Sequence, residues 1–409
     1  MPSYSLETLQ ALALYTQGLT SRHEPTIQNI DRMVEQVGAV QIDTLQMVQR
    51  SQYLTLWSRF GTYNTAEFDR LMYDHEHRRL FEYWWHEACI VPLSEYRYRL
   101  PKMNFYKNGG SKWNADFLAH EETPALMEKI LASIQENGGV RSADFDHNGQ
   151  RGSSWWGWKP AKRALEHLYN TGDLMISRRK SFQRVYDLRE RVLPEWVDTT
   201  VPSEDETNRH LLDISLKAQG VCQPMQTADY TYMKRSIARP HIQALIDEGT
   251  FVEIQGVLQD GKQQTLVVHR DNLDALQQIA DGEIRAEHTT FLSPFDSLWW
   301  AKDRDQQFWN FRQVLEAYKP APIREWGYFC LPILHKNRLV GRFDPKLERK
   351  KGELVLRALY LEPGIEPEDE LVAGVAEAMR DFLNFHHAKA LVLEASSPKE
   401  FGQKLEKTL

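Results

Sequence analysis

Residues 161–188 read AKRALEHLYNTGDLMISRRKSFQRVYDL, and residues 239–269 read RPHIQALIDEGTFVEIQGVLQDGKQQTLVVH. Each stretch begins with an amphipathic helical pattern, reaches a glycine (Gly172 or Gly249) suited to a left-handed helix cap, and continues as a β-hairpin. Four apolar positions match at a constant offset of 77: Leu165, Leu168, Tyr169 and Leu174 correspond to Ile242, Leu245, Ile246 and Phe251. The chain therefore contains an internal repeat of a helix followed by a hairpin.

Two shorter helical patterns precede each copy, at 124–138 and 141–145 in the first and at 206–220 and 226–233 in the second. Three helices and a hairpin, with the third helix running directly into the hairpin, form the winged-helix arrangement. Many winged helices read nucleic acid, but others serve only as scaffolds. Basic residues favour DNA binding by the first copy: Lys159, Lys162, Arg163, Arg178, Arg179, Lys180 and Arg184. The second copy, with Glu253 and Asp260 in its hairpin, is expected to be structural or to face a partner.

Charge is distributed unevenly along the 409 residues, whose formal net charge is −7. Residues 159–191 carry nine Lys or Arg against four acids, a net of +5, and residues 338–351 carry six against two, a net of +4. Two basic segments in an acidic body fit a discrete polyanion-binding face, although an ordinary solvated surface has the same composition.

The composition is that of a globular protein, with 42% hydrophobic and 26% charged residues. No apolar run approaches the roughly 20 residues of a membrane helix, and the first residues lack the pattern of a signal peptide. We therefore expect a cytoplasmic protein, associated with the nucleoid if it binds DNA. The three cysteines, Cys89, Cys222 and Cys330, are widely separated and form no CxxC pair, which argues against a disulfide framework and a thiolate zinc site.

The predicted fold class is α+β, with four modules. Residues 1–120 form an N-terminal winged-helix-like module with helices at 5–19, 26–38 and 65–80; residues 121–200 form the DNA-facing winged helix, and residues 201–286 a second, more acidic one. Residues 287–409 are rich in short β-runs, with turns at HKNR (335–338) and RKKG (349–352), and suggest a small β-barrel or sheet closed by a helix at 367–387.

The segment VQID (40–43) alternates apolar and polar residues. If it is a strand, Gln41 and Asp43 lie on the same face, either exposed to water or placed to act on a substrate. Two further segments carry polar residues among aromatic ones: FEYWWHEACIVPL (81–93), with Trp84, His86 and Glu87, and LSPFDSLWW (292–300), with Asp296. Aromatic clusters of this kind often belong to the core, but their polar groups could also support an active site. Arg342 and Lys346, with Asp344, fit a phosphate clamp on one strand face.

Metal and nucleotide cofactors are not expected. HEAC (86–89) begins like the HExxH zinc motif, but Ile90 occupies the position of the second histidine. Neither GxGxxG after a strand nor GxxxxGK[ST] occurs, so the usual phosphate-binding loops are missing.

Five segments together resemble the YcaQ/AlkX branch of the AlkZ-like (helix-turn-helix 42) DNA glycosylases. They are AVQIDTLQMVQRSQYLTLWSRFG, EYWWHEACIVP, FQRVYDLRERVLPEW, LSPFDSLWW and WGYFCLPILHKNRLVGRFDPKLER, and the resemblance covers essentially the whole chain. It implies tandem winged helices and a β-barrel domain in a C-shaped body around duplex DNA. It also implies excision of N7-alkylated purines and unhooking of interstrand crosslinks, that is, base excision repair of alkylation damage.

The signature of this branch is Gln-apolar-Asp, which is Gln41-Ile42-Asp43 here. The resemblance implies that Gln41 and Asp43 are catalytic, and that DNA is contacted by Arg50, Ser51, the first winged helix and the Arg342 strand. An N7-alkylpurine is cationic and leaves as a neutral base, so one carboxylate for the sugar cation and one amide for water suffice. The motif has no lysine, which predicts a monofunctional enzyme, expected to be a monomer. The alternatives are a non-enzymatic winged-helix transcription regulator and a protein-interaction scaffold.

Overall fold

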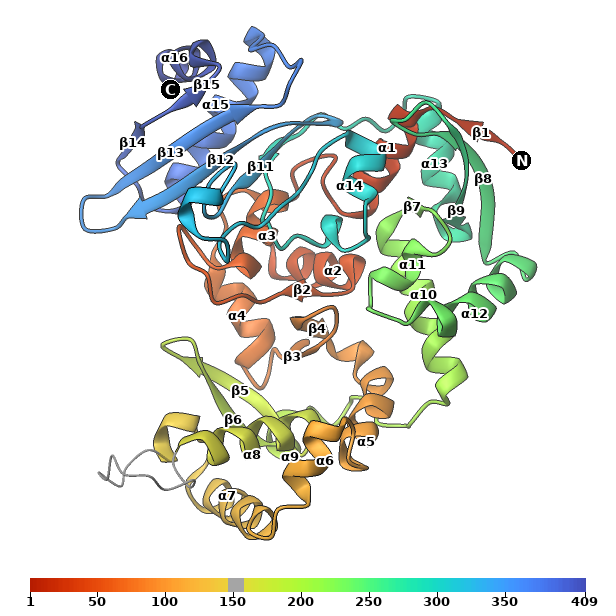
Figure 1. Cartoon of the computed structure of the whole chain (residues 1–409), viewed down its shortest axis with the longest axis vertical. Helices are drawn as coiled ribbons and strands as arrows, with labels where there is room; N and C mark the ends of the chain where they lie inside the picture. Colours follow the sequence, from red (N-terminus) through yellow and green to blue (C-terminus); the bar gives the residue numbers. More distant parts are fainter. Residues whose placement is uncertain (146–157) are drawn as a thin grey trace. The chain divides into compact units, whose positions relative to one another are not determined.

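The computed structural model describes residues 1–145 and 158–409 and shows a mixed α+β protein (Figure 1). The chain forms two compact units. The larger unit contains Met1–Thr65, Trp84–Ile90 and Asn208–Leu409, and the smaller unit contains Ala66–Tyr83 and Val91–Thr207. None of the described helices is long and apolar enough to cross a membrane. The division into four modules remains a prediction.

Helices dominate the smaller unit. Its helices are α4 (Thr65–Tyr73), α5 (Leu100–Lys107), α6 (Lys112–Leu118), α7 (Thr123–Asn137), α8 (Trp158–Asn170) and α9 (Arg189–Val192), and its hairpin is formed by β5 (Leu174–Lys180) and β6 (Gln183–Leu188). Strands β3 (Leu80–Trp84) and β4 (Ala88–Pro92) lie where the chain passes between units. Helix α4 ends at Tyr73, so the helix predicted for 65–80 was too long; a hydrogen-bonded turn from Asp74 to His77 follows.

The larger unit begins with β1 (Ser3–Tyr4), α1 (Leu6–Thr16), α2 (Ile27–Val37), β2 (Val40–Gln41) and α3 (Ser51–Phe60). It continues with α10 (Glu204–Gln219), β7 (Val221–Cys222), α11 (Gln226–Asp229), α12 (Arg235–Asp247), β8 (Phe251–Val257), β9 (Gln263–His269) and α13 (Leu273–Ala280). These strands form a four-stranded sheet in the order β1-β8-β9-β7. The predicted helices at 5–19 and 26–38 are confirmed as α1 and α2.

The repeat is visible in both units. Helix α8 leads into β5–β6 and helix α12 leads into β8–β9, and both hairpins are antiparallel. The two first strands, β5 and β8, keep the offset of 77. Gly172 and Gly249, with φ of 75° and 74°, adopt the left-handed conformation that ends a helix at low cost only for glycine. The predicted order of helix, glycine turn and hairpin is therefore confirmed in both copies.

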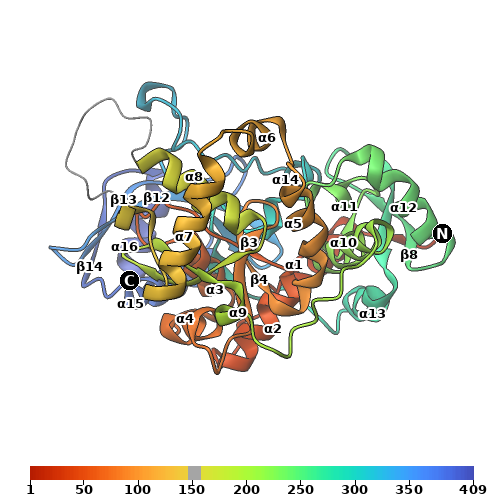
Figure 2. The ribbon, with the colours of Figure 1, turned by 90° about the horizontal axis from the view of Figure 1, so that it is seen from below.

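The C-terminal segment forms a six-stranded sheet. Its elements are β10 (Thr289–Phe291), α14 (Arg304–Trp309), β11 (Leu331–His335), β12 (Arg338–Glu348), β13 (Glu353–Leu361), α15 (Asp369–Phe385), β14 (Ala390–Leu393), β15 (Ser396–Ser397) and α16 (Lys399–Thr408). Strands β10 to β13 are antiparallel neighbours, whereas β14 and β15 pair with β13 in parallel. Helix α15 packs on the sheet (Figures 1 and 2). The predicted helix at 367–387 is confirmed, but two strands and a helix follow it.

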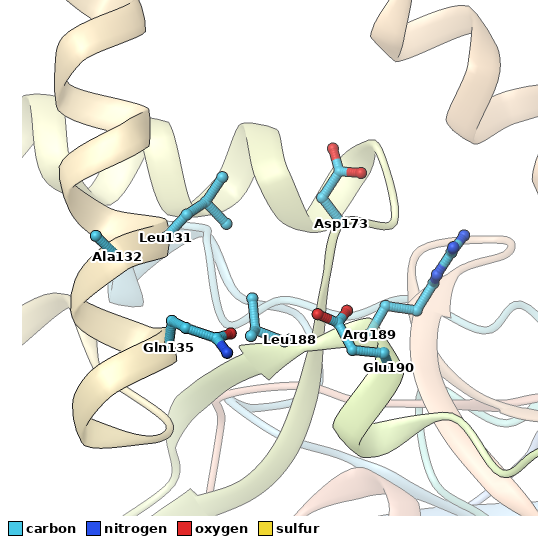
Figure 3. A pocket seen from close by; sticks show the side chains of 7 residues that line it. All are labelled: Leu131, Ala132, Gln135, Asp173, Leu188, Arg189 and Glu190. Carbon is cyan, nitrogen blue, oxygen red and sulfur yellow. The ribbon is translucent and has the colours of Figure 1, made fainter.

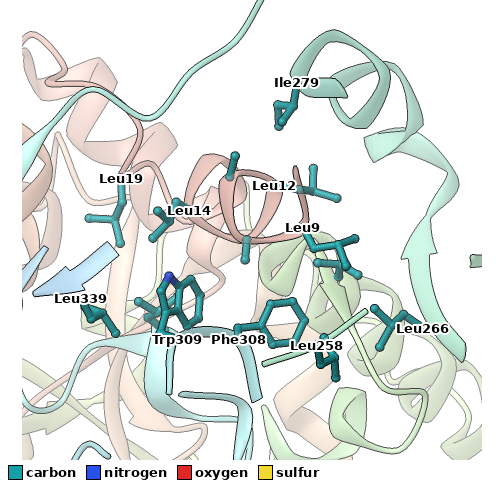
Figure 4. Packing of buried hydrophobic residues seen from close by; sticks show 14 of the residues in the cluster. Leu9, Leu12, Leu14, Leu19, Leu258, Leu266, Ile279, Phe308, Trp309 and Leu339 are labelled. Atoms are coloured by element: carbon teal, nitrogen blue, oxygen red, sulfur yellow. The ribbon is translucent and has the colours of Figure 1, made fainter. Parts of the chain in front are cut away.

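Helix α1 lies in the middle of the larger unit, where it is buried on most sides. Its Leu9, Leu12 and Leu14 belong to one apolar cluster with Phe308 and Trp309 of α14 (Figure 4). Each fully buried side chain of this size contributes about 1.5–3 kcal/mol through removal of apolar surface from water. The first helix is thus part of a core that also contains residues as far along the chain as Leu339.

Candidate functional site

Gln41 and Asp43 do not share a strand face. Strand β2 ends at Gln41, which pairs with Cys89 of β4, and the last sheet-like hydrogen bond runs from the Ile42 N–H to the Ala88 carbonyl (2.8 Å). Asp43 lies in the loop that follows, and its Oδ1 accepts a hydrogen bond from the Leu45 N–H (2.7 Å). An aspartate that bonds its own downstream backbone favours a turn over a strand, so the predicted extended pair was wrong.

Ser51, at the start of α3, holds this segment together. Its fully buried hydroxyl donates to the Gln41 carbonyl (2.9 Å) and accepts from the Asp43 N–H (2.9 Å). The prediction that Ser51 contacts DNA does not fit this burial; its role in the structure is to position the backbone of both predicted catalytic residues. Sequence reasoning placed Ser51 near the site but missed this function.

The loop 44–50 is fixed at further points. The Arg50 guanidinium, half-buried, donates through Nη1 to the Thr44 carbonyl (3.1 Å). The Leu347 N–H of strand β12 donates to the Met47 carbonyl (3.0 Å), and Arg349, just after that strand, donates to the Val48 carbonyl (2.6 Å). The C-terminal sheet and the loop after β2 are therefore parts of one structure.

Asp43 is partly buried, and burial raises the pKa of its carboxyl above the ordinary value of 3.8. Hydrogen bonds from the backbone of Leu45 and Thr44 and the charge of Arg50 act in the opposite direction without cancelling the effect. Gln41 is almost fully buried, and its side-chain amide makes no hydrogen bond to any residue that the structure describes. The site thus offers a carboxyl group that is open to solvent on one side and an amide with unused donors and acceptors.

His86 lies between two aromatic rings, with centroid distances of 3.9 Å to Tyr232 and 4.8 Å to Trp300. Burial lowers its pKa to about 4, so the imidazole is neutral at pH 7. Glu87 is exposed and Trp84 is half-buried. Among the described residues no hydrogen bond joins His86 or Glu87 to Gln41 or Asp43, and their supporting role stays a prediction.

Asp296 has a structural position. Its carboxylate is fully buried and forms a bidentate ion pair with the equally buried guanidinium of Arg59 on α3 (Nη2–Oδ1 3.0 Å). It also accepts a hydrogen bond from the Leu298 N–H (3.1 Å). Because nothing in this arrangement leaves the carboxylate accessible, the predicted active-site role of Asp296 does not fit the structure.

The predicted phosphate clamp on β12 is also corrected. Arg342 is 1% exposed, pairs with Glu362 through Nε and Nη2 (2.9 and 2.7 Å), and lies against the rings of Phe311 and Trp326. A β-bulge after Asp344 breaks the alternation that would align Arg342 with Lys346. Lys346 is half-exposed and pairs with Glu348.

In the smaller unit, two of the predicted DNA-contacting arginines are engaged internally. Arg179 forms a bidentate pair with the buried carboxylate of Glu82 (2.7 and 2.6 Å), and the Arg184 Nε lies 3.9 Å from it. Burial alone would raise the pKa of Glu82, but the charges of both arginines and the Tyr73 hydroxyl outweigh it and the pKa is lowered. Sequence reasoning missed Glu82, which had no local signal.

The other basic residues differ in their surroundings. Arg178 is exposed on β5, as is Lys180. Lys162 lies 3.8 Å from Glu166, and the Arg163 guanidinium lies over the ring of Phe117 (4.6 Å). Lys159 belongs to α8, but its side chain lies outside the described residues.

Three pockets are found among the described residues. An open pocket of about 410 Å³ in the smaller unit is lined by Leu131, Ala132, Gln135, Asp173, Leu188, Arg189 and Glu190 (Figure 3). Two further pockets, of about 390 and 360 Å³, contain neither Gln41 nor Asp43. No group of three metal-ligating side chains occurs within residues 1–145 and 158–409. None of these three pockets is lined by Gln41 or Asp43, which lie at the end of strand β2 and in the loop after it.

The family model for "DNA glycosylase AlkZ-like" matches residues 34–385, and the chain therefore belongs to the AlkZ-like DNA glycosylase family. The protein is a DNA glycosylase. The DNA glycosylase AlkZ of Streptomyces sahachiroi has a similar structure, with a TM-score of 0.65 and 16% sequence identity over 97% of this chain and 100% of that chain. At this identity the similarity describes the fold.

Proposed function

We propose that the protein is a monofunctional DNA glycosylase that hydrolyses the N-glycosidic bond of N7-alkylated purines and unhooks interstrand crosslinks. Asp43 stabilises the positive charge that develops on the sugar and activates the attacking water, and Gln41 positions that water. The observation that carries this proposal is the partly buried Asp43 carboxyl, which accepts a hydrogen bond from the Leu45 N–H just after strand β2, while the Ser51 hydroxyl holds the Asp43 N–H and the Gln41 carbonyl.

The leaving group explains why one carboxylate is enough. In most glycosidases a second carboxyl group protonates the departing oxygen. An N7-alkylated purine is already cationic, so it departs as a neutral base without a proton donor. A fixed anion near the C1′ carbon then stabilises the transition state more than the ground state, which is the requirement for catalysis.

The open position of Asp43 suits a crosslinked substrate. Enzymes that flip a base into an enclosed pocket need the base to be free of the opposite strand. A purine tied to that strand cannot rotate out, so its sugar must be reached from a groove. The partial exposure of the Asp43 carboxyl to solvent is consistent with this approach.

We further propose that the two repeat copies are tandem winged helices and that DNA contacts come from basic residues that are at least partly exposed. In the smaller unit these are Arg178, which is exposed on β5, and Lys162 of α8, while Lys159 and Arg163 of α8 stay predicted contacts. In the larger unit they are Arg50, Lys346 and the exposed turn 349–351 between β12 and β13, which adjoins the loop after Asp43. Contacts of this kind fix the register of the protein on the duplex without reading its sequence.

The test is release of N7-methylguanine from a duplex carrying that lesion at one position, followed by alkaline cleavage of the abasic strand. Wild-type protein should produce the cleaved strand, and Asp43→Asn and Gln41→Ala should each slow its formation by about 100-fold or more, as expected for loss of a general base or an electrostatic group. Asp274→Asn, which changes an exposed carboxylate on α13, is the matched control. Unchanged release by Asp43→Asn refutes the catalytic assignment.

A second substrate tests the crosslink proposal. A duplex crosslinked between N7 atoms by a nitrogen mustard migrates slowly in a denaturing gel, and unhooking restores single strands. We expect wild-type protein to unhook it and Asp43→Asn to leave it intact. Release of the monoadduct with no unhooking would restrict the function to monoadducts.

A further inference from the structure

Residues 312–329, between α14 and β11, carry two prominently exposed apolar side chains. Tyr318 is 75% exposed and Ile323 is 65% exposed. Between them lie Lys319, Pro320, Ala321 and Pro322, and Arg324 follows. The tip 317–324 contains two basic residues and no acidic one, although the whole chain carries a net charge of −7. An exposed apolar tip with basic flanks calls for a functional explanation.

The segment is ordered by its own hydrogen bonds. Glu316, which is 2% exposed, accepts from the backbone N–H groups of Glu325, Trp326 and Gly327 (3.0, 2.7 and 3.3 Å). The Arg324 Nε donates to the Lys319 carbonyl (3.0 Å), and residues Ala321–Ile323 form a short 3₁₀ turn that contains Pro322. Tyr318 and Ile323 are therefore presented on a rigid base, with little conformational entropy left to lose on contact.

Strand β12 fixes this segment beside the loop of Asp43. Arg342 donates to the carbonyl of Arg312 at the beginning of the segment (2.9 Å), and Asp344 accepts from the N–H groups of Tyr328 and Phe329 at its end (3.0 and 2.9 Å). Three residues further along, roughly 10 Å in an extended strand, Leu347 bonds the loop that follows Asp43. The charge of Asp43 raises the pKa of the Tyr318 phenol, as expected if the two side chains lie near each other.

We propose that residues 312–329 form a wedge that enters the base stack of duplex DNA at the lesion, with the Tyr318 ring stacked on a nucleobase and Ile323 packed behind it. This proposal rests on the function proposed above and deepens it. Apolar side chains that separate neighbouring bases occur in proteins that bend DNA, and stacking on an aromatic ring is tolerant of base identity. The wedge opens the step next to the adduct and brings the sugar to Asp43 without rotating the base out of the helix.

The experiment uses a duplex with 2-aminopurine next to a single N7-methylguanine, because 2-aminopurine fluoresces more strongly when it is unstacked. In the Asp43→Asn background, which keeps the substrate intact, binding should raise the fluorescence. Adding Tyr318→Ala should abolish this rise. In the active protein, Tyr318→Ala should slow single-turnover release from the duplex by about tenfold or more, in line with the loss of one stacked base.

Three further comparisons make the result specific. Tyr318→Phe should retain the rate and the fluorescence, because stacking needs the ring and not the hydroxyl. Phe105→Ala, which removes an exposed aromatic ring from α5, should leave both unchanged. Release from a single-stranded oligonucleotide should be insensitive to Tyr318→Ala, since it has no duplex stack to open.

The wedge is refuted if Tyr318→Ala retains both the rate and the fluorescence change, or if Tyr318→Phe is as defective as Tyr318→Ala. Failure of the proposed function gives a different result: Asp43→Asn would then release the base at the wild-type rate, whatever the effect of Tyr318 on fluorescence. The two proposals therefore fail separately.

Discussion

Asp43 combines burial, which favours the neutral acid, with backbone hydrogen bonds and a nearby arginine, which favour the carboxylate. The balance leaves a raised pKa, so the group is more basic than an ordinary surface aspartate and better suited to accept a proton from water. The same backbone bonds fix its position. A single residue thus carries both the charge and the geometry that the proposed reaction requires.

The pH dependence of base release follows from this balance. The carboxylate is the active form and its pKa is raised, so activity is present at neutral pH and is lost as the pH falls, with a midpoint above 3.8. Arg50 lowers the pKa of Asp43, so Arg50→Gln should move the midpoint to higher pH. Single-turnover rates at saturating protein, recorded across the pH range, give the midpoint for the wild-type protein and for Arg50→Gln. His86→Gln serves as the control because His86 titrates near 4; a midpoint that follows His86 contradicts the assignment to Asp43.

At the scale of the element, the hairpin β5–β6 shows why a run of arginines does not identify a binding face. Arg178 and Arg179 are neighbours in sequence, yet one is exposed and the other pairs with a carboxylate 97 positions away in the chain. Side chains alternate along a strand, so consecutive residues point to opposite faces. The face of the hairpin that carries Arg179 is internal because Glu82 lies there, and the sequence around Arg179 does not indicate this partner.

The two arginines should respond differently to alanine substitution. Arg178→Ala should leave the melting temperature unchanged and reduce the slope of log K against log salt for duplex binding by about 0.9, the value for one phosphate contact. Arg179→Ala should lower the free energy of unfolding by about 3 kcal/mol, since it leaves Glu82 buried with a weaker partner. Salt titrations and urea unfolding measure these effects. If instead Arg178→Ala lowered the stability and Arg179→Ala lowered the salt dependence of binding, Arg179 and not Arg178 would be the residue that contacts DNA.

At the scale of the whole molecule, the larger unit is assembled from three separate stretches of chain. Helix α1 near the N-terminus packs with α14, and the Arg59–Asp296 pair joins positions 237 residues apart. A buried ion pair of this kind adds little over an apolar alternative, but breaking it leaves an uncompensated charge inside the protein. The stability of the site loop therefore depends on contacts from the far end of the chain.

Asp296→Asn should consequently destabilise the protein by about 3 kcal/mol or more without removing a catalytic group. The folded fraction of this variant should release N7-methylguanine at close to the wild-type rate. Glu370→Gln, which breaks an exposed pair with Lys336, is the control and should leave the unfolding curve unchanged. A stable Asp296→Asn protein with no activity would restore the catalytic role that its burial argues against.

The repeat, its glycine turns, the β-rich C-terminal segment and the resemblance to the family could all be predicted from the amino-acid sequence alone. These depend on short-range periodicity and on motifs that are contiguous in the chain. The folded structure was needed to show that Asp43 lies in a loop after β2, that Ser51 and Asp296 are buried structural residues, and that Arg342 holds the segment that carries Tyr318. Each of these depends on a partner distant in sequence, and burial and ion pairing are properties of such partners, which local spacing does not encode.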